Sequence, residues 1–490
     1  MGGSSAINAG LYFQPPASDF DLYFPDGWKS EDMKLAISRL NGQQRPTNLT
    51  SQDGVRYLQS GYEAARRWVK EGLQFAETDF VERPDNKTGV FGHPVYDSTN
   101  GQRGGPVVTY LQSAMKRENF HLQTGTLVLR VERNRSHATG VTVLVGGHET
   151  VVPLSPRGRV ILSGGAIMSP GLLMHSGIGS SDILSDLQSA GKLSPSISSN
   201  EWINSSFVGA DLFDNPNTYI ELEGETINSY SYFYEEPPID DRQLFLKSRS
   251  GPYTSASQTS VFWDTTTHQD GTIVGFQGTI DSSGFGNYMS NKTITLNIYG
   301  TSGLKSRGRV VLDKSFIPGP SNDTYYSDPN GQDARDIAAF IFKILQALPG
   351  SGLKSLNIAQ NSTKAEIEKY ITTSSTYARG SVNHWSSSCA IGTCVDQNTT
   401  VIGMENLHVV DGSIIPPLTV NPQFGIMAAA ERASDLIIAL SGKTSLKTSN
   451  YEASTAKPLT TSSSTGGAEP MRTAAPVFGV MALGVAMYGI

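Results

Sequence analysis

Cysteine is scarce in this sequence of 490 residues, which contains only Cys389 and Cys394. Two cysteines complete a structural zinc site only with histidines at ligand spacing, and His384 is the one histidine near them in the sequence. We therefore expect no zinc site, and no other metal site. The two cysteines form either a short-loop disulfide, which a secreted protein would favour, or a reduced pair that is partly buried.

Charge is also sparse. Charged residues make up 17% of the chain, and 38 Lys and Arg against 45 Asp and Glu give a net charge of −7. No cluster of Lys and Arg stands out, so the composition argues against a nucleic-acid partner. The 50 Gly and 25 Pro favour a protein with many turns and long connections over a helical bundle. The length suggests two or three domains.

The N-terminal part of the sequence lacks two recognisable signals. No secretory signal peptide is recognisable, because residues 1–10 have neither a basic region nor an apolar core. The sequence also has no G-x-G-x-x-G motif between a strand and a helix, which is where the phosphates of a dinucleotide would bind.

The C-terminal end differs in composition from the rest. Residues 443–473 form a Ser/Thr-rich linker, and residues 474–490 are uncharged and mostly apolar. The tail is short for a membrane span, and its proline and glycines weaken it as a helix. Small residues, a polar spacer and an apolar tail match a signal for a glycosylphosphatidylinositol (GPI) anchor, which would be the only link to a membrane. A tail anchor or a frayed apolar end is the alternative.

Acceptor sites for N-glycosylation are spread over the chain and favour a secretory route. They lie at Asn48, Asn86, Asn134, Asn204, Asn291, Asn322, Asn361 and Asn398. Together with the tail, they predict a secreted or cell-surface glycoprotein, or one displayed on a cell wall.

The pattern of apolar residues predicts an α/β layer. A buried strand over residues 159–163 ends in two glycines and is followed by a helical pattern from Ser169. A second strand over 407–411 precedes a helix over 426–440, which Gly442 would end. Between them, segments such as 217–223 and 294–299 alternate like strands of an antiparallel sheet.

We therefore expect an incomplete Rossmann-like domain with an inserted antiparallel-sheet domain. The boundaries that we expect are 1–185 for the first part, 186–395 for the inserted domain, 396–442 for the return to the first domain, and then 443–473 and 474–490.

Four ordered blocks carry a family resemblance. Residues 165–179, the opening segment 2–10, the triplet 383–385 and the C-terminal blocks within 410–433 resemble the signatures of the glucose–methanol–choline (GMC) oxidoreductases. The resemblance runs from residue 1 to about residue 442. Within the family it is most similar to the flavoprotein part of fungal cellobiose dehydrogenases.

The resemblance implies an FAD cofactor. The residues that match its contacts are Gly3, Ser4, Ser5, Asn8, Ala9, Gly10, Val128, Asp411, Gly412, Pro422 and Gln423. Glycine suits such a loop because a backbone without Cβ approaches a flat ligand closely, although an ordinary Gly/Ser turn would look the same. In the family a G-x-G-x-x-G motif precedes this loop. Because it is missing here, we expect Met1 to be internal to a longer, N-terminally truncated protein.

The same resemblance identifies the catalytic residues. His384 would be the base that takes the hydroxyl proton, and Asn421 would orient the substrate oxygen. Asn383 would contact sugar hydroxyls, whereas Trp385 either stacks near the flavin or packs in the core. Because histidine ordinarily titrates near neutrality, we expect an acid limb of kcat/KM in the histidine range.

The function expected from the resemblance is FAD-dependent oxidation of an alcohol or of a sugar at C1, giving a lactone. The substrate would be a small molecule, and an external acceptor would take the electrons. Two alternatives stay open: a lyase of hydroxynitriles that contains flavin, and an inactive wall-anchored remnant without the dinucleotide motif.

Overall fold

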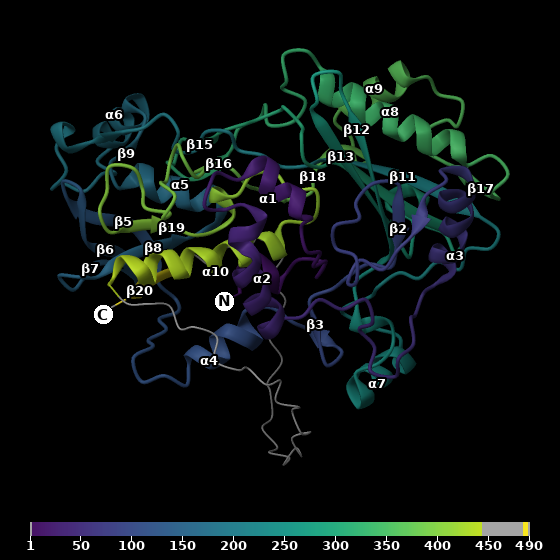
Figure 1. Ribbon diagram of the computed structural model, residues 1–490, viewed down its shortest axis with the longest axis horizontal. Coiled ribbons are helices and arrows are strands. Elements are labelled where there is room, and N and C mark those ends of the chain that lie inside the picture. Colours follow the sequence, from purple (N-terminus) through teal and green to yellow (C-terminus); the bar gives the residue numbers. More distant parts are fainter. Residues whose placement is uncertain (1, 443–483, 489–490) are drawn as a thin grey trace.

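The computed structural model describes residues 2–442 and 484–488 (Figure 1). Its helices are α1 (Ala17–Tyr23), α2 (Ser30–Gln43), α3 (Ser60–Arg67), α4 (Gln112–Ala114), α5 (Gly165–His175), α6 (Ser181–Ser189), α7 (Ile239–Ser248), α8 (Gln332–Ala347), α9 (Lys364–Thr372) and α10 (Gln423–Leu440). Its longer strands are β5 (Leu127–Asn134), β6 (His137–Val145), β7 (His148–Pro153), β8 (Arg159–Ser163), β11 (Pro216–Gly224), β12 (Gln258–Thr267), β13 (Ile273–Asp281) and β14 (Thr293–Gly300). Shorter strands include β1 (Ala76–Glu77), β2 (Val90–Gly92), β17 (Leu353–Ser355), β18 (Ala378–Ser381), β19 (Leu407–Val409) and β20 (Gly484–Tyr488).

One half of the molecule is the expected α/β layer, at the left of Figure 1. Strands β8 and β19 pair in parallel, as the two buried runs predicted, and β20 pairs with β8 in the antiparallel sense. Of the expected anchor signal, only this strand lies within the described residues. Helix α10 covers the region expected from the sequence, and Gly442 follows it with φ of 72°.

Helix α5 begins at Gly165, four residues earlier than its sequence pattern indicated. Pro170 inside it has no N–H to offer to the carbonyl of Ala166, one turn before. The hydroxyl of Ser388 donates to that carbonyl instead. A hydrogen bond from a distant loop therefore allows the helix to begin ahead of its proline.

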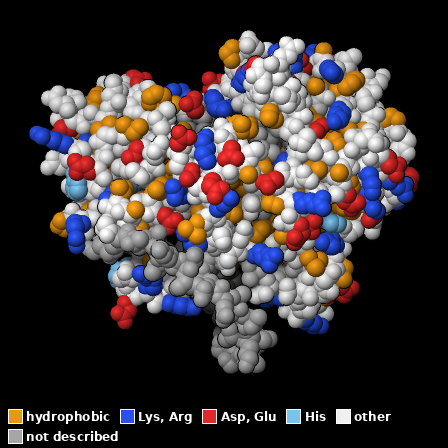
Figure 2. Space-filling model, in the orientation of Figure 1, with side chains coloured by type: hydrophobic (Ala, Val, Ile, Leu, Met, Phe, Trp, Pro, Cys, Tyr) orange, Lys and Arg blue, Asp and Glu red, His pale blue; other side chains and the backbone are white. Residues whose placement is uncertain are grey.

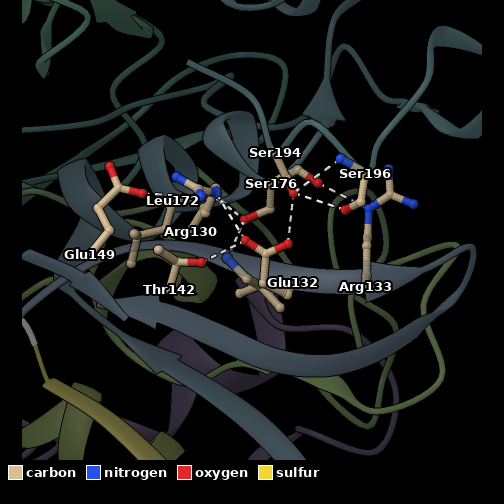
Figure 3. Close-up of polar contacts among 10 residues, drawn as sticks. Arg130, Glu132, Arg133, Thr142, Glu149, Leu172, Ser176, Ser194 and Ser196 are labelled. Atoms are coloured by element: carbon tan, nitrogen blue, oxygen red, sulfur yellow. Dashed lines mark hydrogen bonds and ion pairs between the residues drawn. The ribbon is translucent and has the colours of Figure 1, made fainter. Parts of the chain in front are cut away.

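The three-stranded sheet β5–β6–β7 packs against the end of α5 through buried polar groups (Figure 3). Glu132 accepts hydrogen bonds from Arg130, Thr142 and Ser194. The guanidinium of Arg133, in a residue that is 6% exposed, donates to four backbone carbonyls. These carbonyls belong to Arg135, Ser176, Gly177 and Glu201.

The other half is built on an eight-stranded sheet in the order β1-β2-β12-β13-β14-β11-β17, with β18 also paired to β11. The antiparallel strands expected over 217–223 and 294–299 are confirmed as β11 and β14. One face carries apolar residues such as Ile220, Leu296 and Phe276, in a core cluster shared with residues of α3 and α8.

The opposite face is polar, because side chains alternate along each strand. The strand register aligns Asn217 with Tyr299 and Gln277, and two residues farther along it aligns Tyr219 with Asn297 and Thr279. We call this surface the polar face of the sheet.

The expected domain boundaries stay predictions. Strands β1 and β2, which precede residue 186, lie in the large sheet beside β12. The disulfide between Cys389 and Cys394 is confirmed, with both residues buried. Within the described part of the chain, no helix has the length and hydrophobicity that a bilayer span requires. On the face shown in Figure 2, acidic and basic side chains are interspersed rather than gathered by sign.

We expect Arg133→Ala to lower the free energy of unfolding by about 2–4 kcal/mol, because it leaves buried carbonyls without a donor. Chemical denaturation measures this loss. Arg157→Ala is the control, since Arg157 is exposed in the neighbouring loop. Equal stability of the two variants would contradict the role given to Arg133.

Candidate active site

His384 follows β18 in a loop that a buried carboxylate holds. Its backbone N–H donates to Asp214 Oδ1 at 2.6 Å, and Asp214 also accepts from the hydroxyls of Tyr325 and Ser381. Asp214 is 2% exposed, and burial raises the pKa of its carboxyl. Asp214 thus ties the loop to the start of β11.

The ring of His384 is held by Asn215, the residue that follows Asp214. His384 Nδ1 lies 2.9 Å from Asn215 Oδ1, and Asn215 Nδ2 donates to the carbonyl of Gly300 at 2.7 Å. Because that donation turns the amide oxygen toward the ring, Nδ1 must carry the hydrogen. Nε2 is then left with its lone pair.

Asn421 faces that lone pair. Its Nδ2 lies 3.2 Å from His384 Nε2, and its Oδ1 accepts a hydrogen bond of 2.8 Å from Gln277 Nε2. A continuous series of hydrogen bonds therefore runs from the polar face of the sheet through Asn421 to the imidazole. Gln277 lies on β13, Asn421 lies two residues before α10, and His384 lies in the loop after β18.

Burial lowers the pKa of His384 to about 3. Removing an imidazolium from water disfavours its charged form, and the neighbouring amides add no compensating charge. His384 is therefore neutral, and able to accept a proton, across the ordinary pH range. The acid limb expected in the histidine range stays a prediction, and a lowered pKa of this half-buried residue would move the limb to lower pH.

The first turn of α10 brings the N-terminal loop to this region. Pro422 precedes the helix, and Ser4 Oγ donates to the side-chain oxygen of Gln423 at 3.4 Å. Gly3, Ser4 and Ala9 are exposed. Ser5 is buried and donates to the carbonyl of Gly2, so it shapes the loop from within.

Asn8 also holds the loop together. Its Oδ1 accepts from the N–H of Gly10 and from Arg103 Nη1, each at 2.9 Å. Gly10 has φ of 78°, in the left-handed region that glycine tolerates. Asn8 and Gly10 therefore keep the exposed edge of the loop at the helix N-terminus, whose partial positive charge suits an electron-rich group.

Three predicted cofactor residues lie farther into the α/β half. Asp411 accepts from Ser169 and Gly165 through one oxygen and from Ser413 through the other. Gly412 lies against the backbone of Trp385, since a Cβ there would be 3.1 Å from that carbonyl oxygen. Val128 is 8% exposed, in the core cluster on β5. No hydrogen bond among the described residues joins these three to His384.

The two residues beside His384 were also expected to matter. Asn383 is exposed, with φ of 65°, and its Oδ1 accepts from the indole of Trp385. Trp385 is half-buried and its ring lies 6.3 Å from that of Tyr325. Both readings of Trp385 stay open.

The surface formed by Gly3, Ser4 and Gln423 fits the flavin end of the expected cofactor. A Cβ added to Gly3 would meet nothing within 4 Å, so a flat group has access to the backbone there. The turn between β8 and α5 does not offer a phosphate site. Its amides at Gly164 and Gly165 already donate to the side chains of Ser169 and Asp411. The described residues therefore include a surface suited to the flavin end of FAD, but we assign none of them to its diphosphate.

Several buried acceptors on the polar face have no partner. Asn217 Oδ1, Gln277 Oε1 and Asn297 Oδ1 accept no hydrogen bond from the protein. Leaving such atoms unsatisfied costs about 1–3 kcal/mol each, and because all three are shielded from solvent, only a molecule enclosed among them would pair with them. Tyr299 lies between them, with its ring 5.9 Å from that of His384.

Two carboxyl groups lie at one end of the polar face of the sheet. Glu221 accepts from Thr295 Oγ1 and from the N–H of Phe285, and Asp281 accepts from Gln258 Nε2. Burial raises the pKa of Glu221 to about 7 and that of Asp281 to about 6. As a carboxylate or as an acid, each group exchanges hydrogen bonds with hydroxyls.

Sequence reasoning missed the residues that support His384. Asp214, Asn215 and Gln277 gave no motif of their own, although the polar residues at 217, 219 and 221 alternate in a way that marks one face of a strand. Only that alternation could have indicated the polar face. Among the described residues, no three His, Cys, Asp or Glu side chains are grouped to hold a metal ion.

Family profiles described as GMC oxidoreductase match residues 1–217 and 305–430. The oxygen-dependent choline dehydrogenase of Pseudomonas syringae pv. tomato is 26% identical over 89% of this chain and 79% of its own length. The choline oxidase of Arthrobacter globiformis is 26% identical over 89% and 80%.

Solved structures show the same fold. A formate oxidase has a TM-score of 0.71 and 18% identity, over 89% of this chain and 83% of its own. A fungal aryl-alcohol oxidase has a TM-score of 0.67 and 17% identity, over 90% and 86%. The expected arrangement of two domain types is thus confirmed, while the closer likeness to cellobiose dehydrogenases stays a prediction.

Asn215→Asp should raise the pKa of His384, because a carboxylate 2.9 Å from Nδ1 stabilises the imidazolium. As pH falls through the raised pKa, the base becomes protonated and kcat/KM should drop. The wild type, with a pKa lowered to about 3, should lack this limb.

The pH dependence of kcat/KM measures the effect. Asn119→Asp, at an exposed site outside the glycosylation motifs, adds the same charge far from the ring in sequence and should leave the profile unchanged. Identical profiles for Asn215→Asp and the wild type would contradict the assigned tautomer.

Proposed function

This chain belongs to the GMC oxidoreductase family of FAD-dependent enzymes that act on CH–OH donors, and we propose that it oxidises the C1 hydroxyl of a sugar to a lactone. The observation that carries the proposal is the neutral His384, whose Nε2 lone pair is presented by Asn215 and faced by Asn421. The unpartnered acceptors of the polar face support the choice of a sugar.

His384 acts as the base. A substrate hydroxyl that binds beside Nε2 donates its proton to this nitrogen, because Nδ1 already donates to Asn215. Asn421 Nδ2 is close enough to Nε2 to donate to the same substrate oxygen. Gln277 holds the other end of that amide, so Asn421 orients the oxygen without taking the proton.

FAD, when bound, supplies the acceptor for the hydride that leaves the same carbon. Gly3, Ser4 and Gln423 would hold its flavin end, on the exposed edge of the loop at the start of α10. The positive end of this helix would stabilise negative charge beside it. An external acceptor would then collect the electrons.

The chemistry of the polar face favours a sugar over a quaternary ammonium alcohol. Amide oxygens of Asn217, Gln277 and Asn297 need donors, and a sugar provides several hydroxyl groups in one molecule. A trimethylammonium group has no N–H or O–H to donate. Burying these oxygens against it would leave them unsatisfied.

His384→Ala should lower kcat/KM by ~10²–10⁴-fold, as is typical for the loss of a general base. Asn421→Ala should cost less, about 1–3 kcal/mol, because it removes one orienting hydrogen bond. Steady-state kinetics measure both losses. His148→Ala, at an exposed position on β7, is the control. Near-normal turnover of His384→Ala would exclude it as the base.

A substrate panel tests the sugar proposal. Under anaerobic conditions, an aldose such as cellobiose should bleach the flavin absorbance and yield the lactone. Choline and a simple aryl alcohol should bleach it more slowly at equal concentration. Rapid bleaching by choline with none by sugars would overturn the proposed substrate. No bleaching by any alcohol would overturn oxidation itself and favour a lyase or an inactive protein.

We also propose that the protein is a secreted glycoprotein held at the cell surface or wall by a GPI anchor. Six acceptor asparagines are exposed, namely Asn86, Asn134, Asn204, Asn291, Asn322 and Asn361. Asn48 is half-buried and its Nδ2 donates to Asp79, so a glycan there would break a contact.

A phosphatidylinositol-specific phospholipase should release the protein from membranes, and mass spectrometry should find glycans at the six exposed sites. The mature protein should lack the apolar tail. Mature material that retains residues 477–490 would rule out the anchor.

A further inference from the structure

A buried carboxylate reaches the catalytic segment from the other end of the sequence. Asp19, on α1, is 1% exposed. Its Oδ2 accepts the backbone N–H of Thr419 at 2.8 Å, and its Oδ1 accepts the Thr419 hydroxyl at 2.6 Å. Thr419 lies two residues before Asn421.

The remaining polar atoms of Thr419 are held as well. Its carbonyl accepts from the indole Nε1 of Trp263 at 3.1 Å, and its hydroxyl lies 2.9 Å from Ser302 Oγ. Val420, between Thr419 and Asn421, is 3% exposed and belongs to the cluster that contains Trp263. The N–H, the carbonyl and the hydroxyl of Thr419 thus each have a hydrogen-bond partner.

Side-chain contacts must position this segment, because residues 415–421 belong to neither helix nor strand. The Asn421 amide has to stay within hydrogen-bond distance of His384 Nε2. Even a small misplacement of a catalytic group lowers the reaction rate strongly. No backbone ladder fixes it. The bonds to Thr419 supply the constraint instead.

A buried lysine acts on the charge of Asp19. Lys87 is 5% exposed, and its Nζ lies 5.1 Å from the ring centroids of both Phe80 and Trp263. Lys87 attracts the carboxylate, whereas burial raises the pKa of Asp19 to about 6 and lowers that of Lys87 to about 7. A buried charge is weak evidence for a role in stability alone.

We propose that Asp19 is a positioning residue that acts through Thr419 to hold the Asn421 amide against His384. Its role in turnover rests on the proposed function, whereas its effect on the geometry of His384 does not. Asp19 does not touch the substrate.

The first test observes the ring directly. In protein labelled with ¹⁵N-histidine, the Nε2 signal of His384 is assigned by its loss in His384→Gln. Asp19→Asn should shift that signal toward its position in Asn421→Ala, because Nε2 loses its donor. Asp21→Asn is the matched control, since Asp21 is exposed on the same helix. An unshifted signal in folded Asp19→Asn overturns the proposal.

The second test is a double-mutant cycle on kcat/KM. Asp19→Asn should cost ~10-fold or more in the wild-type background and almost nothing in Asn421→Ala, because residues that act through one another are not additive. The loss should appear mainly in kcat. If the fold-losses in kcat/KM of the two single variants multiply in the double variant, the proposal is overturned.

Thr419→Val serves if Asp19→Asn fails to fold, because it removes only the hydroxyl bonds, while Thr419→Ser keeps them. Valine should shift the His384 signal and serine should not. If the wild type oxidises no alcohol, the proposed function fails, but the NMR signal still decides the role of Asp19.

Discussion

The hydrogen bond between the imidazole of His384 and the amide oxygen of Asn215 sets the tautomer on which the rest of the candidate site depends. The amide is neutral, so it fixes the tautomer without adding charge to offset the burial of the ring. The ring consequently stays neutral, with its lone pair at Nε2. Asp214 holds the backbone of the same loop, and Gly300 holds the amide, so Asp214 and Asn215, which directly precede β11, connect the large sheet to the loop of His384.

The large sheet serves both stability and recognition because its strands alternate. Its apolar face is covered by helices, whereas its polar face presents acceptors that the protein leaves unsatisfied. Such atoms reduce stability unless another molecule pairs with them. If the protein oxidises a sugar as proposed, the polar face gives up stability in the free protein in exchange for selectivity toward hydroxyl groups.

Local patterns in the sequence were enough to predict β8, β19, α10 and the strands β11 and β14, because hydrophobic spacing and glycine placement depend on neighbours in the chain. The spacing of the two cysteines left a disulfide and a reduced pair as alternatives, and the fold shows the disulfide. His384 and Asn421 were predicted only through the resemblance of short blocks. Asp214, Asn215 and Gln277 could not be found, because their partners lie 144–170 residues away. The direction of the pKa shift of His384 could not be predicted for the same reason, since burial is a property of the assembled fold.

The contact between Asp19 and Thr419 joins residues that are 400 positions apart. A ribosome adds ~5–20 residues per second, so α1 emerges roughly 20–80 s before its partner exists. During that time the carboxylate of Asp19 has no Thr419 to pair with, although Phe20 and Phe24 in the same segment can already pack together. The contact between Asp19 and Thr419 forms only after residue 419 has left the ribosome. Nascent chains of this protein should be most prone to aggregation late in synthesis, when most apolar surface has been made but the closing segment has not.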